Sequence, residues 1–249
     1  LPDFDGAKDY RIPQQMLRDG LKKTAYAIST DETRYVLNGI YTSFREGKLT
    51  LVATDGRRLA MVENDLEFPA SQEVDVIVPT KAVQELQRLL GTDGEVLVQL
   101  SDSQISFTIG EHLLVSKMIE GNYPNYRQVI PKDAGSKVRL EREKLLESVN
   151  RAALMTDDRN NTIRMSVTKK TQNLEISAKS DSGDAHEPIA VKYEGPDVNI
   201  AFNPQYIIDP LKALTEDEVD FEFKDEMSPG VIRGLKDDFL CVVMPQRIS

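Results

Sequence analysis

A pattern that occurs four times along the chain constrains its fold more than any other feature of the sequence. In each copy a short extended run meets a helix-start signal, an amphipathic stretch follows, and about three strand-like runs come next. The extended runs are residues 10–13, 76–79, 138–140 and 199–204, and the amphipathic stretches are residues 14–27, 80–90, 141–154 and 205–214. The repeating unit is therefore strand, helix and three strands.

Apolar side chains recur in each amphipathic stretch at the spacing of one helix face. These faces comprise Leu17, Leu21, Ala25 and Ile28; Val83, Leu86 and Leu90; Leu145, Val149 and Ala152; and Ile207, Leu211 and Leu214. Thr80 and Asn203 are candidate N-caps, and Pro210 is expected to kink the fourth helix or end it early, because proline lacks a backbone N–H. The expected strands are residues 35–44, 49–54 and 58–62; 95–100, 104–109 and 113–118; 162–168, 174–178 and 189–193; and 219–223, 231–235 and 239–243.

One repeat has a single helix and a short sheet, which cannot bury both of its faces. Pairing two repeats lets two helices pack together under the sheets, which predicts an α+β fold with two repeats in each domain. We expect one domain at residues 1–131 and a second at 136–249; residues 131–136 contain Pro, Gly and Ser and form the connection. Repeats that stack edge to edge tend to form an arc or ring.

Composition excludes several classes of protein. The net charge of −10 argues against a protein that coats nucleic acid through bulk charge. The single cysteine, Cys241, excludes an internal disulfide and a cysteine-rich metal site, and its apolar neighbours predict a buried thiol. No run approaches the ~20 apolar residues that cross a bilayer, and the acidic start lacks the features of a signal peptide. A reducing cytoplasm fits this cysteine usage.

Catalytic motifs are missing from the sequence, which has neither a phosphate-binding Gly-x-x-x-x-Gly-Lys-Ser/Thr loop nor a Gly-x-Ser-x-Gly elbow. His112 and His186 lie in different domains without ligand-like neighbours. Residues 54–59 (TDGRRL) predict a tight hairpin turn in which Gly56 supplies an unusual backbone angle. Adjacent acids in polar segments are read as solvated rather than as metal ligands: Asp157, Asp158, Asp181 and Asp184. We therefore expect no catalytic residue, metal or cofactor.

Basic residues recur on the outer face of every expected helix. They are Arg18, Lys22 and Lys23 on the first, Lys81 and Arg88 on the second, Lys144 and Arg151 on the third, and Lys212 on the fourth. A solvated polar face is the alternative interpretation, and Asp19, Glu85 and Glu147 on the same helices support it. Recurrence in all four repeats favours a shared function: a ring with these helices inside would present a weakly positive lining to phosphates, independent of base sequence.

Several stretches together resemble one known family. Residues 34–39 (RYVLNG) and 51–60 (LVATDGRRLA) look like the middle domain of the bacterial DNA polymerase III beta subunit. Residues 116–126 (SKMIEGNYPNY) and 129–131 (VIP) are similar to the end of that domain. Phe202, Asn203 and Tyr206, with residues 242–248 (VVMPQRI), match its last domain. The resemblance covers the whole chain.

This resemblance implies a DNA clamp fold, in which helices lie inside and sheets outside a ring that encircles duplex DNA. Two subunits of three similar domains form that ring, head to tail. The chain resembles only the middle and C-terminal domains, and its start, residues 1–8, resembles the inter-domain linker that follows a first domain. We therefore expect this chain to be monomeric and unable to close a ring.

The resemblance also implies a peptide-binding pocket between the middle and last domains. Its wall would comprise Leu37, Thr54, Gly56, Arg57, Arg58, Leu59, Pro124, Val129, Asn203, Tyr206, Val242, Met244, Pro245, Arg247 and Ile248. Expected partners are the replicative polymerase, the clamp loader and repair proteins, which bring short peptides with Gln, Leu and Phe. The sequence departs from the family pattern at Gln128, where Arg is common, at Gln246, where a second Met is frequent, and at Ser249, beyond the usual end.

The sequence thus predicts a non-catalytic processivity factor, a subunit of the DNA polymerase III holoenzyme. One alternative is a metal-dependent nuclease or polymerase module that uses the Asp clusters, which would need carboxylates converging from separate strand ends. A second alternative is a protein-interaction scaffold that never touches DNA. It predicts that changing Lys22 and Lys81 to Glu leaves every DNA-linked activity of the restored full-length protein intact.

Overall fold

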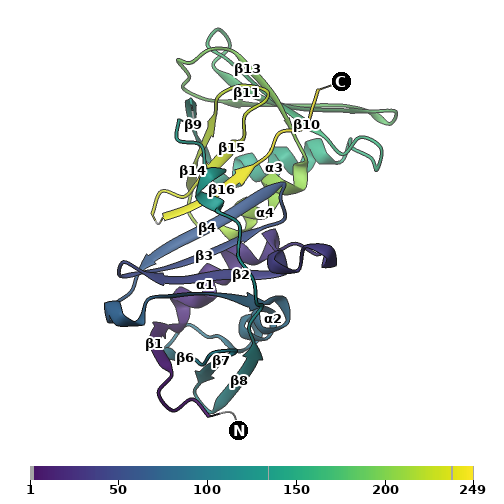
Figure 1. Cartoon of the computed structure of the whole chain (residues 1–249). Coiled ribbons are helices and arrows are strands. Elements are labelled where there is room, and N and C mark those ends of the chain that lie inside the picture. Colours follow the sequence, from purple (N-terminus) through teal and green to yellow (C-terminus); the bar gives the residue numbers. More distant parts are fainter. Residues whose placement is uncertain (1–2, 134, 237, 249) are drawn as a thin grey trace. The chain divides into compact units, whose positions relative to one another are not determined.

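The computed structural model describes residues 3–133, 135–236 and 238–248 and forms two compact units, Leu1–Tyr126 and Arg127–Ser249 (Figure 1). Leu1 and Pro2 of the first expected linker, Ala134 of the second, and Ser249 lie outside the described residues. Each unit contains two copies of the predicted repeat, so the fourfold strand–helix–three-strand pattern is confirmed.

Unit 1 holds the first two repeats. The first comprises β1 (Lys8–Pro13), α1 (Gln14–Thr24), β2 (Gly39–Arg45), β3 (Lys48–Thr54) and β4 (Arg58–Asp65). The second comprises β5 (Val74–Pro79), α2 (Thr80–Leu89), β6 (Glu95–Leu100), β7 (Gln104–Ile109) and β8 (His112–Lys117). Four short 3₁₀ turns also occur in the described chain: η1 (Ala25–Ala27), η2 (Glu32–Leu37), η3 (Ala70–Gln72) and η4 (Tyr126–Gln128).

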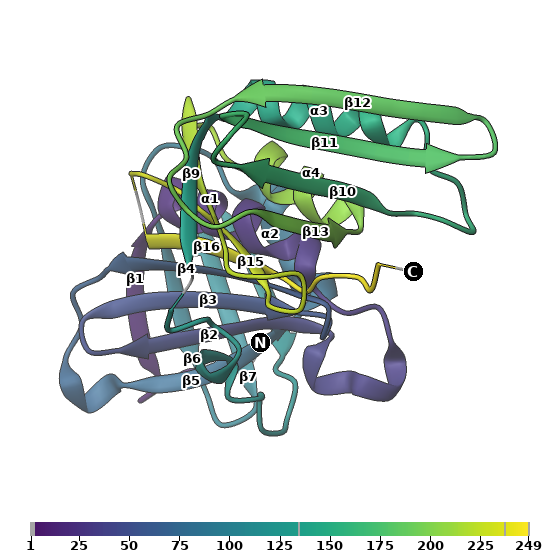
Figure 2. The same ribbon diagram turned by 90° about the horizontal axis from the view of Figure 1, so that it is seen from above.

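Unit 2 holds the other two repeats. The third comprises β9 (Ser136–Glu141), α3 (Arg142–Ala153), β10 (Ile163–Thr168), β11 (Asn173–Ser180) and β12 (Gly183–Ala190). The fourth comprises β13 (Val198–Phe202), α4 (Pro204–Ala213), β14 (Glu218–Phe223), β15 (Gly230–Arg233) and β16 (Asp238–Val243). Figure 2 shows α3 and α4 behind the strands β10 to β13, and α3 contacts β10, β11 and β12.

Paired repeats exchange their first strands. In unit 1, β1 pairs with β6 of the second repeat and β5 pairs with β2 of the first, so the strand orders are β1-β6-β7-β8 and β5-β2-β3-β4. Unit 2 has the matching orders β13-β10-β11-β12 and β9-β14-β15-β16. Each set of four paired strands therefore needs strands from both repeats, which explains why two repeats make each compact unit.

The predicted helix faces point into the two cores. Buried side chains include Leu17 and Leu21 of α1; Val83 and Leu86 of α2, with Leu90 just beyond it; Leu145, Val149 and Ala152 of α3; and Ile207 and Leu211 of α4, with Leu214 just beyond it. The first face was predicted too long. Helix α1 ends at Thr24, whose φ of −126° leaves the helical range, so Ala25 lies in η1 and Ile28 is extended.

Three further local predictions need correction. Residues 35–37 belong to η2 rather than a strand, because Asp31 accepts a hydrogen bond from Thr33 N at 3.0 Å and caps this turn. Strand β12 occupies Gly183–Ala190 rather than 189–193, since it forms a hairpin with β11. The N-cap of α2 is Pro79, while the Thr80 hydroxyl donates to the Asn38 carbonyl at 2.7 Å.

The cap of α4 is confirmed, because the Asn203 side chain accepts a hydrogen bond from Gln205 N at 2.9 Å. Helix α4 does not end at Pro210 but continues to Ala213, because proline withholds only its own backbone donor, and Leu214 N still donates to the Pro210 carbonyl at 3.1 Å. In the described parts of the chain, no helix has the length and apolar character needed to span a membrane.

Candidate functional site

The turn between β3 and β4, with the strand residues that flank it, carries five of the predicted peptide-binding residues, and the carboxylate of Asp55 shapes this turn. Asp55 Oδ1 accepts hydrogen bonds from Arg57 N at 2.9 Å and Arg58 N at 3.1 Å, and Thr54 Oγ1 donates to the Arg58 carbonyl at 2.7 Å. Gly56 has φ +88°, a conformation that costs glycine little. The predicted tight turn is therefore confirmed.

Two adjacent arginines in this turn have different surroundings. The Arg58 side chain is 11% exposed; its Nε donates to Asp55 Oδ2 at 3.3 Å, and an Nη donates to the Tyr26 carbonyl at 2.8 Å. Its guanidinium also lies 5.5 Å from the centre of the Tyr26 ring, within the range of a cation–π contact. Arg57 is exposed. The geometry assigns Arg58 to holding the turn and leaves Arg57 accessible to a ligand.

Pro124 lies in a segment that tyrosines hold against β2. The ring of Tyr123 stacks on Tyr41 with centroids 5.0 Å apart, and Tyr126 lies 5.6 Å from Tyr41. Burial, and then the Asp75 carboxylate, raises the pKa of Tyr41 to about 12, so this phenol stays neutral at ordinary pH. Pro124 itself is exposed, and the tyrosines keep its backbone in place.

The predicted apolar residues divide into buried and exposed sets. Leu37, Leu59 and Val242 are each 2% exposed, whereas Val129 is 49% and Met244 is 42% exposed. Thr54, Asn203, Tyr206, Pro245 and Ile248 are intermediate, and Gly56 and Arg247 are exposed. Among the apolar members, Pro124, Val129 and Met244 are therefore the exposed ones that a ligand can reach.

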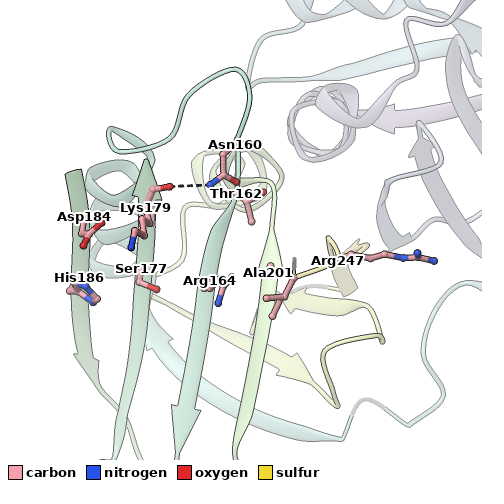
Figure 3. Close-up of a pocket in the computed structure, with 11 residues that line it drawn as sticks. Asn160, Thr162, Arg164, Ser177, Lys179, Asp184, His186, Ala201 and Arg247 are labelled. Atoms are coloured by element: carbon pink, nitrogen blue, oxygen red, sulfur yellow. Dashed lines mark hydrogen bonds between the residues drawn. The ribbon is translucent and has the colours of Figure 1, made fainter. Parts of the chain in front are cut away.

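The C-terminal segment after β16 is held along β13 in unit 2. Gln246 N donates to the Ala201 carbonyl at 2.8 Å, and the Thr162 hydroxyl donates to Gln246 Oε1. Gln246, where the sequence departs from the family pattern, thus has a side chain that anchors this segment. Figure 3 shows Arg247 beside Ala201, with its guanidinium directed away from Arg164.

The predicted DNA-facing cations lie on neighbouring helices, because α1 contacts α2 and α3 contacts α4. Two of them are engaged by acids: Arg88 Nη1 lies 2.7 Å from Glu85 Oε1, and Arg151 Nη2 lies 2.9 Å from Glu187 Oε2. Lys23 is half-buried. The remaining members are exposed: Arg18, Lys22, Lys81, Lys144 and Lys212.

The residues that the sequence analysis considered for catalysis make contacts that shape or pack the fold. Asp157 Oδ1 accepts from Arg159 N and Asn160 N at 2.9 and 2.8 Å, which shapes the loop before β10. His186 has a neighbour that the sequence did not predict, since its Nδ1 lies 3.0 Å from Glu175 Oε1 across the β11–β12 pair. Cys241 is buried, as predicted. Within the described residues, no group of three or more His, Cys, Asp or Glu is placed to hold a metal.

Comparison with known proteins gives two adjacent family matches. Residues 11–125 match the central domain of the DNA polymerase III beta subunit, and residues 127–247 match its C-terminal domain. The beta sliding clamp of Chlamydia muridarum is 32% identical over 248 residues, and that of Pseudomonas aeruginosa is 34% identical over 246 residues. These alignments cover 100% and 98% of this chain, and 67% and 66% of those proteins.

The chain belongs to the beta sliding clamp family.

Solved clamp structures confirm the predicted α+β DNA clamp fold. The sliding clamp of Bacillus subtilis superposes with a TM-score of 0.95 at 29% identity, covering 100% of this chain and 67% of that one. A P. aeruginosa clamp bound to griselimycin gives a TM-score of 0.91 at 34% identity, covering 96% and 65%. This chain therefore spans about two-thirds of the length of the clamps it matches.

Sequence reasoning did not identify several residues that hold Arg58 and Gln246 in place. Tyr26 and Asp55 hold Arg58, and Ala201 and Thr162 hold Gln246. Asp55 lies inside the recognised motif, and its position before a glycine is a turn signal that could have identified it. Tyr26, Thr162 and Ala201 act from distant positions in the chain, where no local pattern marks them.

Proposed function

We propose that this chain serves as part of a sliding clamp, the non-catalytic processivity factor of bacterial DNA replication. In the whole protein, a homodimeric ring would encircle duplex DNA in the cytoplasm as a subunit of the DNA polymerase III holoenzyme. The observation that carries this proposal is the pair of adjacent family matches over residues 11–125 and 127–247. Relatives named as beta sliding clamps, aligned over 98% or more of this chain, support it.

The first part of the proposed function is contact with DNA through helix faces. Exposed cations occur on all four long helices, although the chain as a whole has a net charge of −10. A cation that neutralises a phosphate releases a condensed counterion, so such contacts bind DNA without reading its sequence and weaken as salt rises. Because Arg88 and Arg151 already pair with acids, we assign most of the contact to Arg18, Lys22, Lys81, Lys144 and Lys212.

Duplex binding at low salt tests this part. We expect weak binding by the chain, and Lys22→Glu combined with Lys81→Glu should reduce both the affinity and its salt dependence. Each lost phosphate contact lowers the slope of log K against log salt by roughly 0.9. The measurement is fluorescence anisotropy of a labelled duplex over a salt series.

The matched control combines Lys170→Glu with Lys192→Glu, two exposed lysines outside the helices that give the same change in net charge. This control should bind nearly as the native chain does. Equal loss in both double variants would mean that only total charge matters. Unchanged binding by the Lys22/Lys81 variant would favour the alternative, a protein-interaction scaffold that does not use DNA.

The second part of the proposed function is binding of short partner peptides that contain Gln, Leu and Phe, brought by the polymerase, the clamp loader and repair proteins. Exposed Val129 and Met244 supply apolar contact, and methionine adapts to different partners. Exposed Arg57 and Arg247 supply orienting polar groups. The P. aeruginosa clamp with griselimycin bound supports ligand binding by this family.

A further inference from the structure

A cavity in unit 2 begins at Arg247 and Ile248, two residues that the family resemblance predicted, and extends over strands that it did not predict. Its volume is about 490 Å³, and it lies over the face of β10, β11 and β12 that is directed away from α3 (Figure 3). Its charged lining consists of Arg164, Lys179, Asp184, His186 and Arg247. Arg247 directs its guanidinium away from Arg164 (Figure 3), but Arg164 and Lys179 still outnumber Asp184, so the cavity is locally positive in a chain of net charge −10.

Strand register brings the two central cations to one face. Arg164 of β10 is opposite Ser177 of β11, and Lys179 follows Ser177 by two positions, so both side chains leave the same side of the sheet. The Asn160 side chain donates to the Lys179 carbonyl at 3.0 Å and ties the loop before β10 to the end of β11 (Figure 3). This face of the sheet therefore holds the two cations at fixed positions.

Among the described residues, no acid engages these cations, unlike several others in unit 2. Across the described residues, Arg164, Lys179 and Arg247 form no ion pair. Other cations of the same unit do, including Arg139 with Asp220 and Lys169 with Glu194, at 2.9 and 2.8 Å. An unpaired positive cavity can bind an anionic group with a direct electrostatic gain and without first breaking an internal pair.

The cavity is continuous with the proposed peptide-binding segment. Arg247 belongs to both, and the bond from Gln246 N to the Ala201 carbonyl fixes the chain just before it. Met244, three positions earlier, is 42% exposed. A peptide in contact with Met244 would therefore need only a few more residues to reach Arg164.

We propose that this cavity binds acidic side chains that flank the motif of a partner peptide, an inference that rests on the proposed function. The mixed lining favours a peptide over a nucleic acid. Asp184 lies within the cavity, and Glu175 lies 3.0 Å from His186 at its edge, so a continuous row of phosphates would meet repulsion. Separate carboxylates can be placed beside Arg164 and Lys179 and away from these acids.

The test is a titration of the chain with three labelled peptides in fluorescence anisotropy. All contain the same Gln-Leu-x-Leu-Phe-type motif; one has no extension, one is extended at both ends by Asp residues, and one is extended equally by Ser. We expect the Asp peptide to bind about threefold to tenfold more tightly than the Ser peptide, as two partly exposed ion pairs would give. Lys179→Glu and Arg164→Glu should each remove most of that difference.

Lys170→Glu is the matched control, because it makes the same charge change in the β10–β11 turn, outside the cavity lining. It should keep the preference for Asp. Equal binding of the Asp and Ser peptides to the native chain would overturn the inference while leaving the proposed function intact. Equal loss in Lys170→Glu and Lys179→Glu would also overturn it, because bulk charge would then explain the preference.

Two further outcomes separate the remaining explanations. Failure of the unextended peptide to bind a folded chain would overturn the proposed function and this inference with it. Displacement of the Asp peptide by an oligothymidylate, abolished by Lys179→Glu, would assign the cavity to nucleic acid instead. No displacement, together with the expected preference for Asp, supports the peptide.

Discussion

At the scale of single residues, the β3–β4 turn shows how neighbouring identical side chains acquire different roles. Arg57 and Arg58 are indistinguishable by composition, but only Arg58 is held by both Asp55 and the Tyr26 carbonyl. The sequence predicted the turn because Gly56 follows Asp55, a local signal. It could not predict the contact with Tyr26, which lies 32 positions away and depends on packing.

Replacing each arginine with lysine tests this difference. Arg58→Lys should lower the free energy of unfolding by roughly 1–2 kcal/mol, because lysine cannot donate in both directions with the guanidinium's planar fork. Arg57→Lys, the matched control, should cost less than about 0.5 kcal/mol, as exposed substitutions usually do. Urea unfolding followed by circular dichroism measures both, and equal transition midpoints for the two variants would contradict the assignment.

At the scale of elements, the buried helix faces were predictable because apolar spacing is a local signal. The ends of helices and strands were less predictable. Helix α1 ends early because the backbone at Thr24 departs from helical angles. Strand β12 was placed too late because its first residues, Gly183 to Glu187, are mostly polar and gain their strand structure from pairing with β11. The exchange of β1 and β5 between repeats depends on pairings between distant residues, which no local pattern reports.

The β9–β14 pair predicts a pH effect on stability. Arg139 lies opposite Asp220, and its hydrogen bonds hold the pKa of this carboxyl below the ordinary 3.8, against the opposing effect of burial. A carboxyl whose folded pKa is depressed contributes stability above its unfolded pKa and loses that contribution as pH falls through the folded pKa. Asp220→Asn should therefore lower the free energy of unfolding at pH 7 by about 1 kcal/mol.

The difference between native and Asp220→Asn chains should shrink as pH falls below about 4, because Asp220 then begins to gain its proton in the unfolded chain and, at lower pH, in the folded chain. Urea midpoints at a series of pH values measure this trend. Asp225→Asn serves as a comparison in an exposed loop, where hydrogen bonds from Ser228 and Met227 lower the pKa of that carboxyl. A difference for Asp220→Asn that stays constant down to pH 2 would contradict the role of its charge.

At the scale of the whole molecule, four copies of one unit account for the two compact bodies and the clamp fold. The family resemblance predicted which residues to consider for peptide binding, since those motifs are specific in combination. It could not separate the accessible members from the buried ones. Leu37, Leu59 and Val242 are almost fully buried, so their substitution would change folding as well as binding, while Met244 and Arg57 are accessible.

Titration of the chain with a labelled Gln-Leu-x-Leu-Phe-type peptide tests the central proposal most directly. We predict saturable binding at roughly micromolar strength, about −8 kcal/mol, weakened about tenfold by Met244→Ala. Met227→Ala, at a methionine that is 67% exposed in the β14–β15 loop, should bind as the native chain does. No binding by a chain that circular dichroism shows to be folded, or equal weakening in both methionine variants, would contradict the account.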